Sequence, residues 1–504
     1  MSLTHHRDSI VSLLVTLARE QPDLPLYTFL LSGQDKTDVL TCRQLLLAAQ
    51  KIAGNLCARN LSGEPVMVLN PYGPAFLEAV FGAMLAGCPC VPVTFHARLG
   101  MANISSIIAR TGLRIVVGNQ DVLTQFRAGR CRTNPRFIDA RHQLEYLATD
   151  TLQHIQGELP TISDTEVAVL YPGVASDEEL PLVSLSHADM LRSAEGLVQA
   201  LSLNTDDRLL TCLDLADGLA LALHILVPLQ ARLPSLLLPI ELALADAASW
   251  VMAASTFSCT IVSAPVAVLT LAARNGELTG NVQPDLSAIR MICVSGERSI
   301  TPALISHFID QYGNNGISAD KLFCCLGLSS AGSYLAGRLG FKTLVKNDIA
   351  YLALGVSDTR GLRATMTGSR WIHIDNELCC TGRINHRFTV SGRTFQAEDI
   401  EAFILQVFGE RGLSRCVALR IDEIEQTVLL AECASKQLAE HWQGVVPTMI
   451  EQVQRHTGCR LDRVIILRPG SLFSAVSGIV HRQSCADALL DGSMLLRLLP
   501  VRGK

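Results

Sequence analysis

Residues 382–401 read GRINHRFTVSGRTFQAEDIE, and this stretch decides how the rest of the chain is interpreted. Apolar residues alternate through 384–390, which predicts a half-buried strand. Ser391 and Gly392 are typical of a turn, and the two acids before 400–408 suit the first turn of a helix. The stretch therefore predicts a strand, a turn, a second strand and the start of a helix.

Length and composition limit the class of protein. The chain has 504 residues, of which 49% are apolar and 18% charged, so it can bury substantial cores and is too long for one ordinary domain. Its net charge is −5, and it has no block of basic residues. Because phosphate binding needs clustered Lys and Arg, we expect no nucleic-acid or anionic-membrane surface.

No stretch predicts targeting or insertion into a membrane. Residues 1–21 contain a short apolar run without a small-residue cleavage site and continue as an amphipathic helix, so we predict no signal peptide and a cytoplasmic location. The longest apolar run, 218–229, is shorter than the about 20 residues needed to cross a bilayer. It predicts a buried helix.

The 16 cysteines lack the paired spacing of a metal site. Close pairs such as Cys88 and Cys90, or Cys324 and Cys325, cannot form a tetrahedral site alone. We predict buried free thiols and no metal.

Helical and strand patterns alternate along two segments, 42–117 and 167–326, with a helix predicted over 42–59 and strands over 65–69, 90–93 and 208–213. Such alternation is typical of parallel sheets with crossover helices, so the fold class is α/β. We predict one sheet from the first segment and a second sheet from the other, starting with a strand at 167–171.

The 382–401 stretch also resembles the crossover of the adenylate-forming (AMP-binding) enzymes, especially the fatty acyl-AMP ligases. Their pattern runs roughly GR-x-x-D-x-x-x-x-x-G-R-x-x-x-P-x-D-I-E. The matching residues, without a gap, are Gly382, Arg383, Gly392, Arg393, Asp399, Ile400 and Glu401. The resemblance implies a hinge at Arg383, Asn385 and His386, where His386 stands in the place of the hinge aspartate and Ala397 in that of the proline.

The resemblance implies an AMP-binding-like large domain of two stacked, parallel-rich sheets at 1–380 and a small α+β lid domain at 381–504. The family places a β-rich third subdomain between its adenine-binding turn and its Thr-Gly-Asp strand. Here only residues 333–366 intervene, so we predict that this subdomain is truncated.

The phosphate-binding loop of the family is the first of its motifs to be lost. In the family this loop is rich in Thr, Ser and Gly and ends in Pro-Lys-Gly, so that N–H groups, hydroxyls and a lysine hold the ATP phosphates. Here the loop keeps little of that character, and its degenerate positions are Gly173, Ser176, Asp177, Glu178 and Glu179. Pro181 stands in the place of the lysine. Three consecutive carboxylates would repel a triphosphate.

Three further ligand positions of the family also differ. At the adenine turn Gly327 is kept, but Leu326 replaces the stacking tyrosine and Ser330 the metal-binding glutamate. Ser369 replaces the ribose-binding aspartate, and Ile479 replaces the lysine that stabilises the adenylation transition state. We therefore predict no catalytic residues, cofactor or metal, with the catalytic functions lost at Pro181, Ser330, Ser369 and Ile479.

Two weaker signals allow other interpretations. Ser329 and Ser330 follow a glycine, as in a nucleophile elbow, but the pattern lacks its second glycine and no base can be assigned. His224 and Asp217 lie near the His-Asp-Met-Gly acyl-pocket motif of the family but are out of register. A hydrogen-bonded core histidine is the simpler interpretation of His224.

The leading functional hypothesis is a pseudoenzyme of fatty-acid, polyketide or peptide metabolism. It would bind an acyl group, an acyl carrier protein or a synthase partner without activating an acyl group as its adenylate. One alternative is a working fatty acyl-AMP ligase or an ATP-independent acyl-transfer enzyme. Another is a structural subunit that pairs with an intact paralogue.

Overall fold

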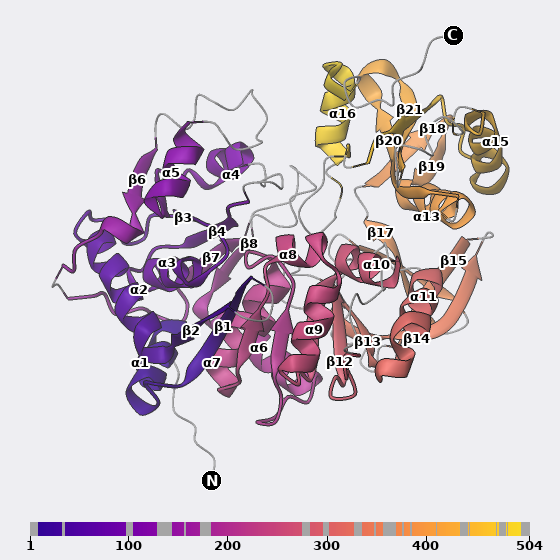
Figure 1. Ribbon diagram of the computed structural model, residues 1–504. Helices are drawn as coiled ribbons and strands as arrows, with labels where there is room; N and C mark the ends of the chain where they lie inside the picture. The colour runs from indigo at the N-terminus through magenta and orange to yellow at the C-terminus, as the bar shows by residue number, and fades with distance from the viewer. Residues whose placement is uncertain are drawn as a thin grey trace. The chain divides into compact units, whose positions relative to one another are not determined.

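The structure of the protein is a computed structural model (Figure 1). It describes residues 9–32, 36–96, 104–128, 144–155, 158–171, 183–274, 283–295, 302–326, 335–346, 349–355, 369–374, 377–383, 386–409, 411–433, 442, 444–469, 471–472, 480 and 482–494. They form two compact units. The large unit holds the described residues up to Ser295 and those of His307–Ala336; the small unit holds those from Gly337 onward together with 302–306. The predicted boundary between the large domain and the lid domain, after residue 380, stays a prediction.

The first sheet of the large unit has the strand order β6-β5-β3-β4-β7-β8. Its strands are β3 (Val66–Asn70), β4 (Cys90–Thr94), β5 (Ile115–Gly118), β6 (Glu145–Ala148), β7 (Val167–Tyr171) and β8 (Val183–Ser186). Neighbours are parallel except β7 and β8.

Helices cover both faces of this sheet. Val66 and Val68 share a core with α2 (Cys42–Cys57) and α3 (Pro74–Leu85). Met67 and Leu69 point to the opposite face, where they share a core with α4 (Ile104–Thr111) and α5 (Gln120–Arg127). A strand buried on both sides is what the continuous apolar runs of the sequence require.

The second sheet runs β13-β12-β11-β9-β10-β1-β2 within the large unit. Its strands are β1 (Pro25–Ser32), β2 (Lys36–Thr41), β9 (Leu209–Thr211), β10 (Ser235–Leu237), β11 (Ile261–Pro265), β12 (Met291–Ser295) and β13 (Leu322–Leu326). Neighbours are parallel except β1 and β2. The associated helices are α1 (Ile10–Glu20), α6 (His187–Ala200), α7 (Val227–Ala231), α8 (Ile240–Ala245), α9 (Ala248–Thr256), α10 (Val266–Arg274) and α11 (Pro302–Tyr312).

The buried helix predicted over 218–230 begins as a π-helix, Ala220–Leu226, and continues as α7. Every residue of the π-helix is buried. The hydroxyl of Tyr27 donates to the carbonyl of Ile225 at 2.6 Å, which satisfies a backbone group of this irregular turn.

The small unit begins with antiparallel strands β14 (Leu335–Lys346), β15 (Ile349–Gly355), β16 (Ser369–Ile374) and β17 (Glu377–Arg383). It continues with a hairpin, α13 (Ala397–Phe408) and a three-stranded sheet in the order β20-β21-β22. The remaining elements are β20 (Leu413–Ile421), β21 (Gln426–Cys433), α15 (Val446–Thr457), β22 (Arg463–Leu467) and α16 (Arg482–Leu490). One face of the three-stranded sheet packs on α13 and α15, the other on α16.

The local structure predicted for 382–401 is confirmed over its described part. The hairpin consists of β18 (Arg387–Val390) and β19 (Arg393–Gln396) and leads directly into α13. The turn holds Ser391 at φ 49° and Gly392 at φ 76°, a left-handed pair that closes two antiparallel strands. Ile384 and Asn385 lie outside the described residues.

One predicted strand joins a different sheet, and another pair was not predicted. Strand β7 belongs to the first sheet and not to the second, because it pairs with β4 through Cys90 and Val169 and then turns back as β8. The N-terminal hairpin β1–β2 extends the second sheet beside β10.

The described cysteines that the structure assigns are free thiols, and all but Cys57 are buried, as predicted. Within the described part of the chain no helix is both long and apolar enough to cross a membrane.

Candidate functional site

Both sheets of the large unit change winding direction between two adjacent strands. In the first sheet β3 connects to β4, whereas β4 connects to β5 on the other side of β3. In the second sheet β9 connects to β10, whereas β10 connects to β11 on the other side of β9. Doubly wound sheets bind ligands outside the carboxyl ends of their strands at such switch points. The residues after β3, β4, β9 and β10 are therefore the first to examine.

Four polar residues from three of these strand ends meet in one group, which we call the His96 cluster: Thr94, His96, Asp214 and Glu241. The imidazole Nε2 of His96 lies 2.6 Å from Oδ2 of Asp214, and its Nδ1 makes a short contact to Oε1 of Glu241. The hydroxyl of Thr94 donates to Oδ1 of Asp214 at 2.6 Å. Residues near the ends of β4, β9 and β10 are thus joined by side chains.

Electrostatics make His96 a cation. Burial alone would lower the pKa of His96, but its hydrogen bonds to Asp214 and Glu241, together with both carboxylate charges, raise it to about 10. Burial raises the pKa of Asp214 and of Glu241, and the bonds to His96 outweigh this and hold both pKa values below their usual range. An imidazolium between two carboxylates leaves one net negative charge.

The cluster is closed at its centre and open at one end. The exposed fraction of the side chain is 3% for His96, 17% for Asp214 and 35% for Glu241. Oδ1 of Asp214 also accepts from the backbone N–H of Ala216 at 2.8 Å. Oε2 of Glu241 makes no hydrogen bond to any other residue among those described. Its carboxylate keeps one acceptor for a ligand or for water.

Tyr72, just beyond β3, brings a second unsatisfied group to the same edge. Its hydroxyl oxygen is buried and makes no regular hydrogen bond in the described structure, although the backbone of Leu30 lies near enough to lower the pKa of Tyr72 against the larger effect of burial. Burial, then the charges of Cys212 and Glu241, raise the pKa of Tyr72 well above its usual value. Its ring packs edge-on against Phe29, with centroids 5.6 Å apart. All four strand ends at the two switch points therefore contribute polar groups.

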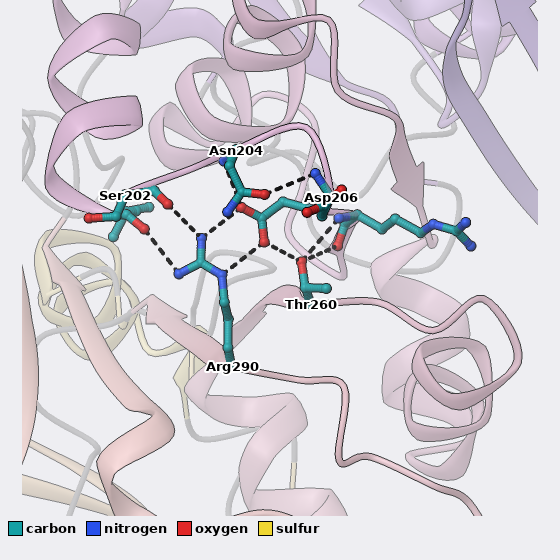
Figure 2. Close-up of polar contacts among 8 residues, drawn as sticks. Ser202, Asn204, Asp206, Thr260 and Arg290 are labelled. Carbon is teal, nitrogen blue, oxygen red and sulfur yellow. Dashed lines mark hydrogen bonds and ion pairs between the residues drawn. The ribbon is translucent and has the colours of Figure 1, made fainter.

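A second charged group, the Arg290 cluster of Asp207, Thr260 and Arg290, lies at the opposite ends of the strands (Figure 2). Arg290 precedes β12 and donates to both carboxylate oxygens of Asp207 at 2.8 Å. The hydroxyl of Thr260 donates to the same carboxylate at 2.7 Å. Further Arg290 N–H groups reach the carbonyls of Leu201 and Ser202. With the N–H of Asn204, each oxygen of Asp207 accepts two hydrogen bonds, so the arrangement holds the starts of the strands together and leaves this carboxylate no free acceptor.

His224 is a hydrogen-bonded core histidine, as the simpler interpretation predicted. It lies in the π-helix with no exposed surface, and its Nε2 lies 2.6 Å from the hydroxyl of Ser263. Burial lowers the pKa of His224 to about 3, so it is neutral. Asp217 accepts from the N–H of Leu219 at 2.8 Å at the start of the same helix, and burial raises its pKa to about 6.

Most of the predicted ligand-loss positions lie outside the described residues. These are Gly173, Ser176, Asp177, Glu178, Glu179, Pro181, Gly327, Ser329, Ser330 and Ile479. Leu326 ends β13, Ser369 begins β16 and Arg383 ends β17, which places their backbones but not their side chains. The predicted loss of function at these positions stays a prediction.

The described part of the predicted hinge shows what holds His386. Its Nδ1 lies 2.6 Å from Oε1 of Glu398 in the first turn of α13, and 9% of the His386 side chain is exposed. The amide of Gln396 donates to the other oxygen of Glu398 in a short contact. An aspartate at 386 would meet the Glu398 carboxylate with like charge, so the histidine and this glutamate suit each other.

The His96 cluster was not predicted from the sequence, although signals for it exist. His96 and Asp214 each follow a short buried strand that the sequence does predict, at 90–93 and 208–213. Polar residues just after such strands lie at the ligand edge of a parallel sheet. What the sequence could not supply is the pairing of two sheets that brings these ends together. No group of three or more His, Cys, Asp or Glu among the described residues is arranged to hold a metal ion.

Comparison with known proteins agrees with this fold. The family model of the AMP-binding enzymes matches residues 15–334. A long-chain-fatty-acid–AMP ligase of Mycobacterium tuberculosis is 22% identical, with 95% of this chain and 97% of the relative covered. A 4-hydroxyphenylalkanoate adenylyltransferase of Mycobacterium marinum is also 22% identical, covering 95% and 91%. The first of these alignments spans 570 positions against the 504 residues here, so the relative carries insertions.

Solved structures give the same result. One from a study of fatty acyl-adenylate ligases of E. coli and L. pneumophila superposes with a TM-score of 0.75 at 17% identity, covering 97% of this chain and 98% of that one. The structure of McyG A-PCP complexed with phenylalanyl-adenylate gives a TM-score of 0.74 at 15% identity, covering 99% and 98%. The α/β fold with parallel-rich sheets is that of the acyl-AMP ligases. With its family model matching most of its length, the chain belongs to the AMP-binding enzyme family.

Proposed function

We propose that this chain is a catalytically degenerate relative of the acyl-AMP ligases that binds an acyl group or a protein partner without forming an adenylate. The observation that carries the proposal is the phosphate-loop sequence, in which Pro181 stands in the place of the lysine and Asp177, Glu178 and Glu179 are consecutive. Each charge-assisted bond to a phosphate is worth about 1.5–3 kcal/mol, and this loop replaces such bonds with repulsion.

The helix that follows the loop supports the same conclusion. Helix α6 begins with a capping box, in which Asp189 accepts from the N–H of Ser186 at 3.0 Å and from its hydroxyl at 2.7 Å. The hydroxyl of Ser186 in turn accepts from the N–H of Asp189. The N–H groups of His187 and Ala188 donate to the carbonyls of Glu166 and Asp164, so the first turn of the helix offers fewer free N–H groups to the phosphates of a nucleotide.

The ligand class follows from the relatives. Several are named as long-chain-fatty-acid–AMP ligases, and one structural neighbour is complexed with acyl adenylate and pyrophosphate. We infer that an acyl group is what this chain retains from that activity. The partner we infer is an acyl carrier protein or a synthase subunit.

The small unit is the proposed docking surface. Its fold is kept although Ile479 replaces the catalytic lysine. Two carboxylates hold the chain on both sides of that position. Glu432 accepts from the backbone N–H groups of Ser471 and Leu472 at 2.8 Å, and Glu401 forms an ion pair with Arg482 at 2.6 Å and 2.8 Å. We infer that the His386–Glu398 contact keeps the predicted hinge in one setting.

The test of lost adenylation is nucleotide binding and exchange. We expect no shift of the thermal midpoint with ATP and Mg²⁺ at millimolar concentration, and no pyrophosphate exchange with fatty acids. The variant Ile479→Lys should likewise show no pyrophosphate exchange. Ligand at 100 times its dissociation constant would stabilise by about 2.7 kcal/mol, a shift of several degrees. An active long-chain ligase from the relatives serves as the positive control. Exchange above background would show a working ligase instead.

The docking role needs its own test. We expect the full chain, used as bait, to capture an acyl carrier protein from its own host, and the double variant Arg387→Glu, Arg393→Glu to capture less, since both side chains are exposed on the hairpin. Exposed Arg19 in the large unit provides the matched control as Arg19→Glu. Equal capture by all three proteins would rule out this face of the small unit.

A further inference from the structure

We propose that His96 is an internal ligand: its imidazolium occupies a two-carboxylate cation site, formed by Asp214 and Glu241, at the edge where the large unit would otherwise bind the cationic group of a ligand. In doing so it ties the ligand edges of the two sheets together. The inference rests on the proposed function in one respect, because a ligand edge occupied by the chain's own side chain suits a protein that does not turn over substrates.

The position of the cluster carries the first step. His96 follows β4 at the switch point of the first sheet, and the two carboxylates follow β9 and β10 at the switch point of the second. Both are places where doubly wound sheets bind ligands. An ion pair that only stabilises the fold does not require the ligand-binding ends of two sheets. The Arg290 cluster, which is such an ion pair, lies at the opposite ends of the strands.

The geometry is that of a receptor and its ligand. Each ring nitrogen of His96 has one carboxylate oxygen, and the hydroxyl of Thr94 and the N–H of Ala216 fix the orientation of Asp214. A planar cation with N–H donors on opposite sides fits between these oxygens. The His96 side chain is only 3% exposed, so the bonds form away from bulk water, where they are strong.

A count of acceptors shows what remains for a second ligand. Each carboxylate oxygen can accept two hydrogen bonds. Oδ1 of Asp214 already accepts two, Oδ2 of Asp214 and Oε1 of Glu241 each have one contact to His96, and Oε2 of Glu241 accepts none from another described residue. A buried ammonium group needs partners for three donors and would also meet the like charge of the imidazolium. The cluster therefore disfavours amine-bearing ligands while His96 is in place.

The decisive experiment is chemical rescue of His96→Ala at pH 6, where free imidazole is largely protonated. We expect imidazole to raise the thermal midpoint of the variant in a saturable way and to leave the wild type unchanged. The matched probe is 1-methylimidazole, which has the same ring but one N–H donor when protonated. It should bind about tenfold more weakly, the cost of one lost charge-assisted hydrogen bond.

Two controls separate a cation site from a mere cavity. In the double variant His96→Ala, Glu241→Gln, the preference for imidazole over 1-methylimidazole should shrink to about twofold or less, since a neutral amide binds a cation less well. Asp207→Asn, in the Arg290 cluster, should be destabilised but show no response to imidazole. Hydrogen exchange of the peptides containing 209–219 and 238–246 should rise in His96→Ala and fall again on saturation with imidazole.

Rescue with the expected preference supports the inference. A response of the wild type equal to that of the variant, no response of the variant, or equal affinity for the two probes would each overturn it. If His96→Ala folds only when imidazole is present, that also supports it. If it folds under neither condition, His96→Gln replaces it, and an unchanged thermal midpoint for that variant would overturn the inference. ATP binding by the wild type would overturn the proposed function and leave this result unaffected.

Discussion

The two charged clusters of the large unit have similar components and different consequences. The Arg290 cluster joins strand starts, and each carboxylate oxygen of Asp207 in it accepts two hydrogen bonds. The His96 cluster joins strand ends and leaves Oε2 of Glu241 without a bond to another described residue, and the hydroxyl of nearby Tyr72 makes no regular hydrogen bond in the described structure. Complete pairing marks a structural role, whereas incomplete pairing at a switch point marks a place for ligands. Four substitutions test this difference.

The largest effect is expected from Asp207→Ala. Only 3% of the Asp207 side chain is exposed, and its removal takes two of the four acceptors from Arg290, whose side chain is 35% exposed. Breaking a fully buried pair from one side costs about 3–5 kcal/mol, and the exposed part of Arg290 puts the expected loss at the low end of that range. Urea denaturation followed by circular dichroism measures the loss, and acyl or partner binding should be unchanged in the folded fraction. A loss below about 1 kcal/mol would show that the Arg290 cluster does not stabilise the fold.

The next effect is a dependence of stability on pH that His96 creates. Its pKa is raised in the folded state from a usual 6.5 to about 10, so its contribution is complete below pH 6.5 and is lost as the pH rises. We expect the free energy of unfolding to fall by about 1.4 kcal/mol per pH unit between pH 6.5 and 8.5. In His96→Gln this alkaline slope should disappear.

Two other buried histidines do not titrate in that window. Burial lowers the pKa of His187 to about 4 and that of His224 to about 3, so these two affect stability only below about pH 6.5. The lowered pKa values of Asp214 and Glu241 add stability that is lost as the pH falls below their usual 3.8 and 4.5. An equal slope in wild type and His96→Gln would assign the pH dependence to groups outside the cluster.

A smaller effect is expected from Thr94→Val. The substitution keeps the shape of the side chain and removes one hydrogen bond to Asp214, which the imidazolium still partners. The cost should be about 1.5 kcal/mol, the low end for a hydrogen bond to a charged group. Thr260→Val, which removes the equivalent bond in the Arg290 cluster, gives the matched comparison in the same denaturation experiment. A loss above about 3 kcal/mol for Thr94→Val would mean that the threonine does more than orient Asp214.

The smallest effect is expected from Tyr72→Phe. Because its buried hydroxyl makes no regular hydrogen bond in the described structure, removing it should change the free energy of unfolding by less than about 0.5 kcal/mol or stabilise the protein slightly. A ligand that uses this hydroxyl would bind more weakly to the variant. A destabilisation of about 2 kcal/mol without ligand would show that the hydroxyl is already satisfied, and Tyr72 would then leave the candidate site.

The sequence predicts elements better than it predicts their neighbours. Helix α2 and strands β3 and β4 have periodic or continuous apolar patterns, and their predicted positions agree with the structure to within one or two residues. Strand β7 was assigned to the wrong sheet because the residues of a strand do not indicate which strand it pairs with. In the structure Val169 of β7 pairs with Cys90 of β4, which places β7 in the first sheet. The N-terminal hairpin β1–β2 was missed because its partner β10 lies far along the chain.

The same limit applies to the site. The family motifs are continuous in sequence, so their losses at Pro181 or Ile479 can be seen without a structure. The His96 cluster is assembled from segments 118 and 145 residues apart. A histidine after one strand and an acid after another are ordinary residues until two switch points place them within hydrogen-bonding distance.

The hairpin β1–β2 has a consequence for the order in which the protein can fold during synthesis. Strand β1 leaves the ribosome early, but its parallel partner β10 and the Ile225 carbonyl bound by Tyr27, 198 residues away, follow much later. Long loops must close before such contacts repay their entropy, which slows folding. Until then the apolar strand PLYTFLLS lacks its parallel neighbour and leaves that edge unpaired. We expect chains truncated before β10 to aggregate or to engage chaperones.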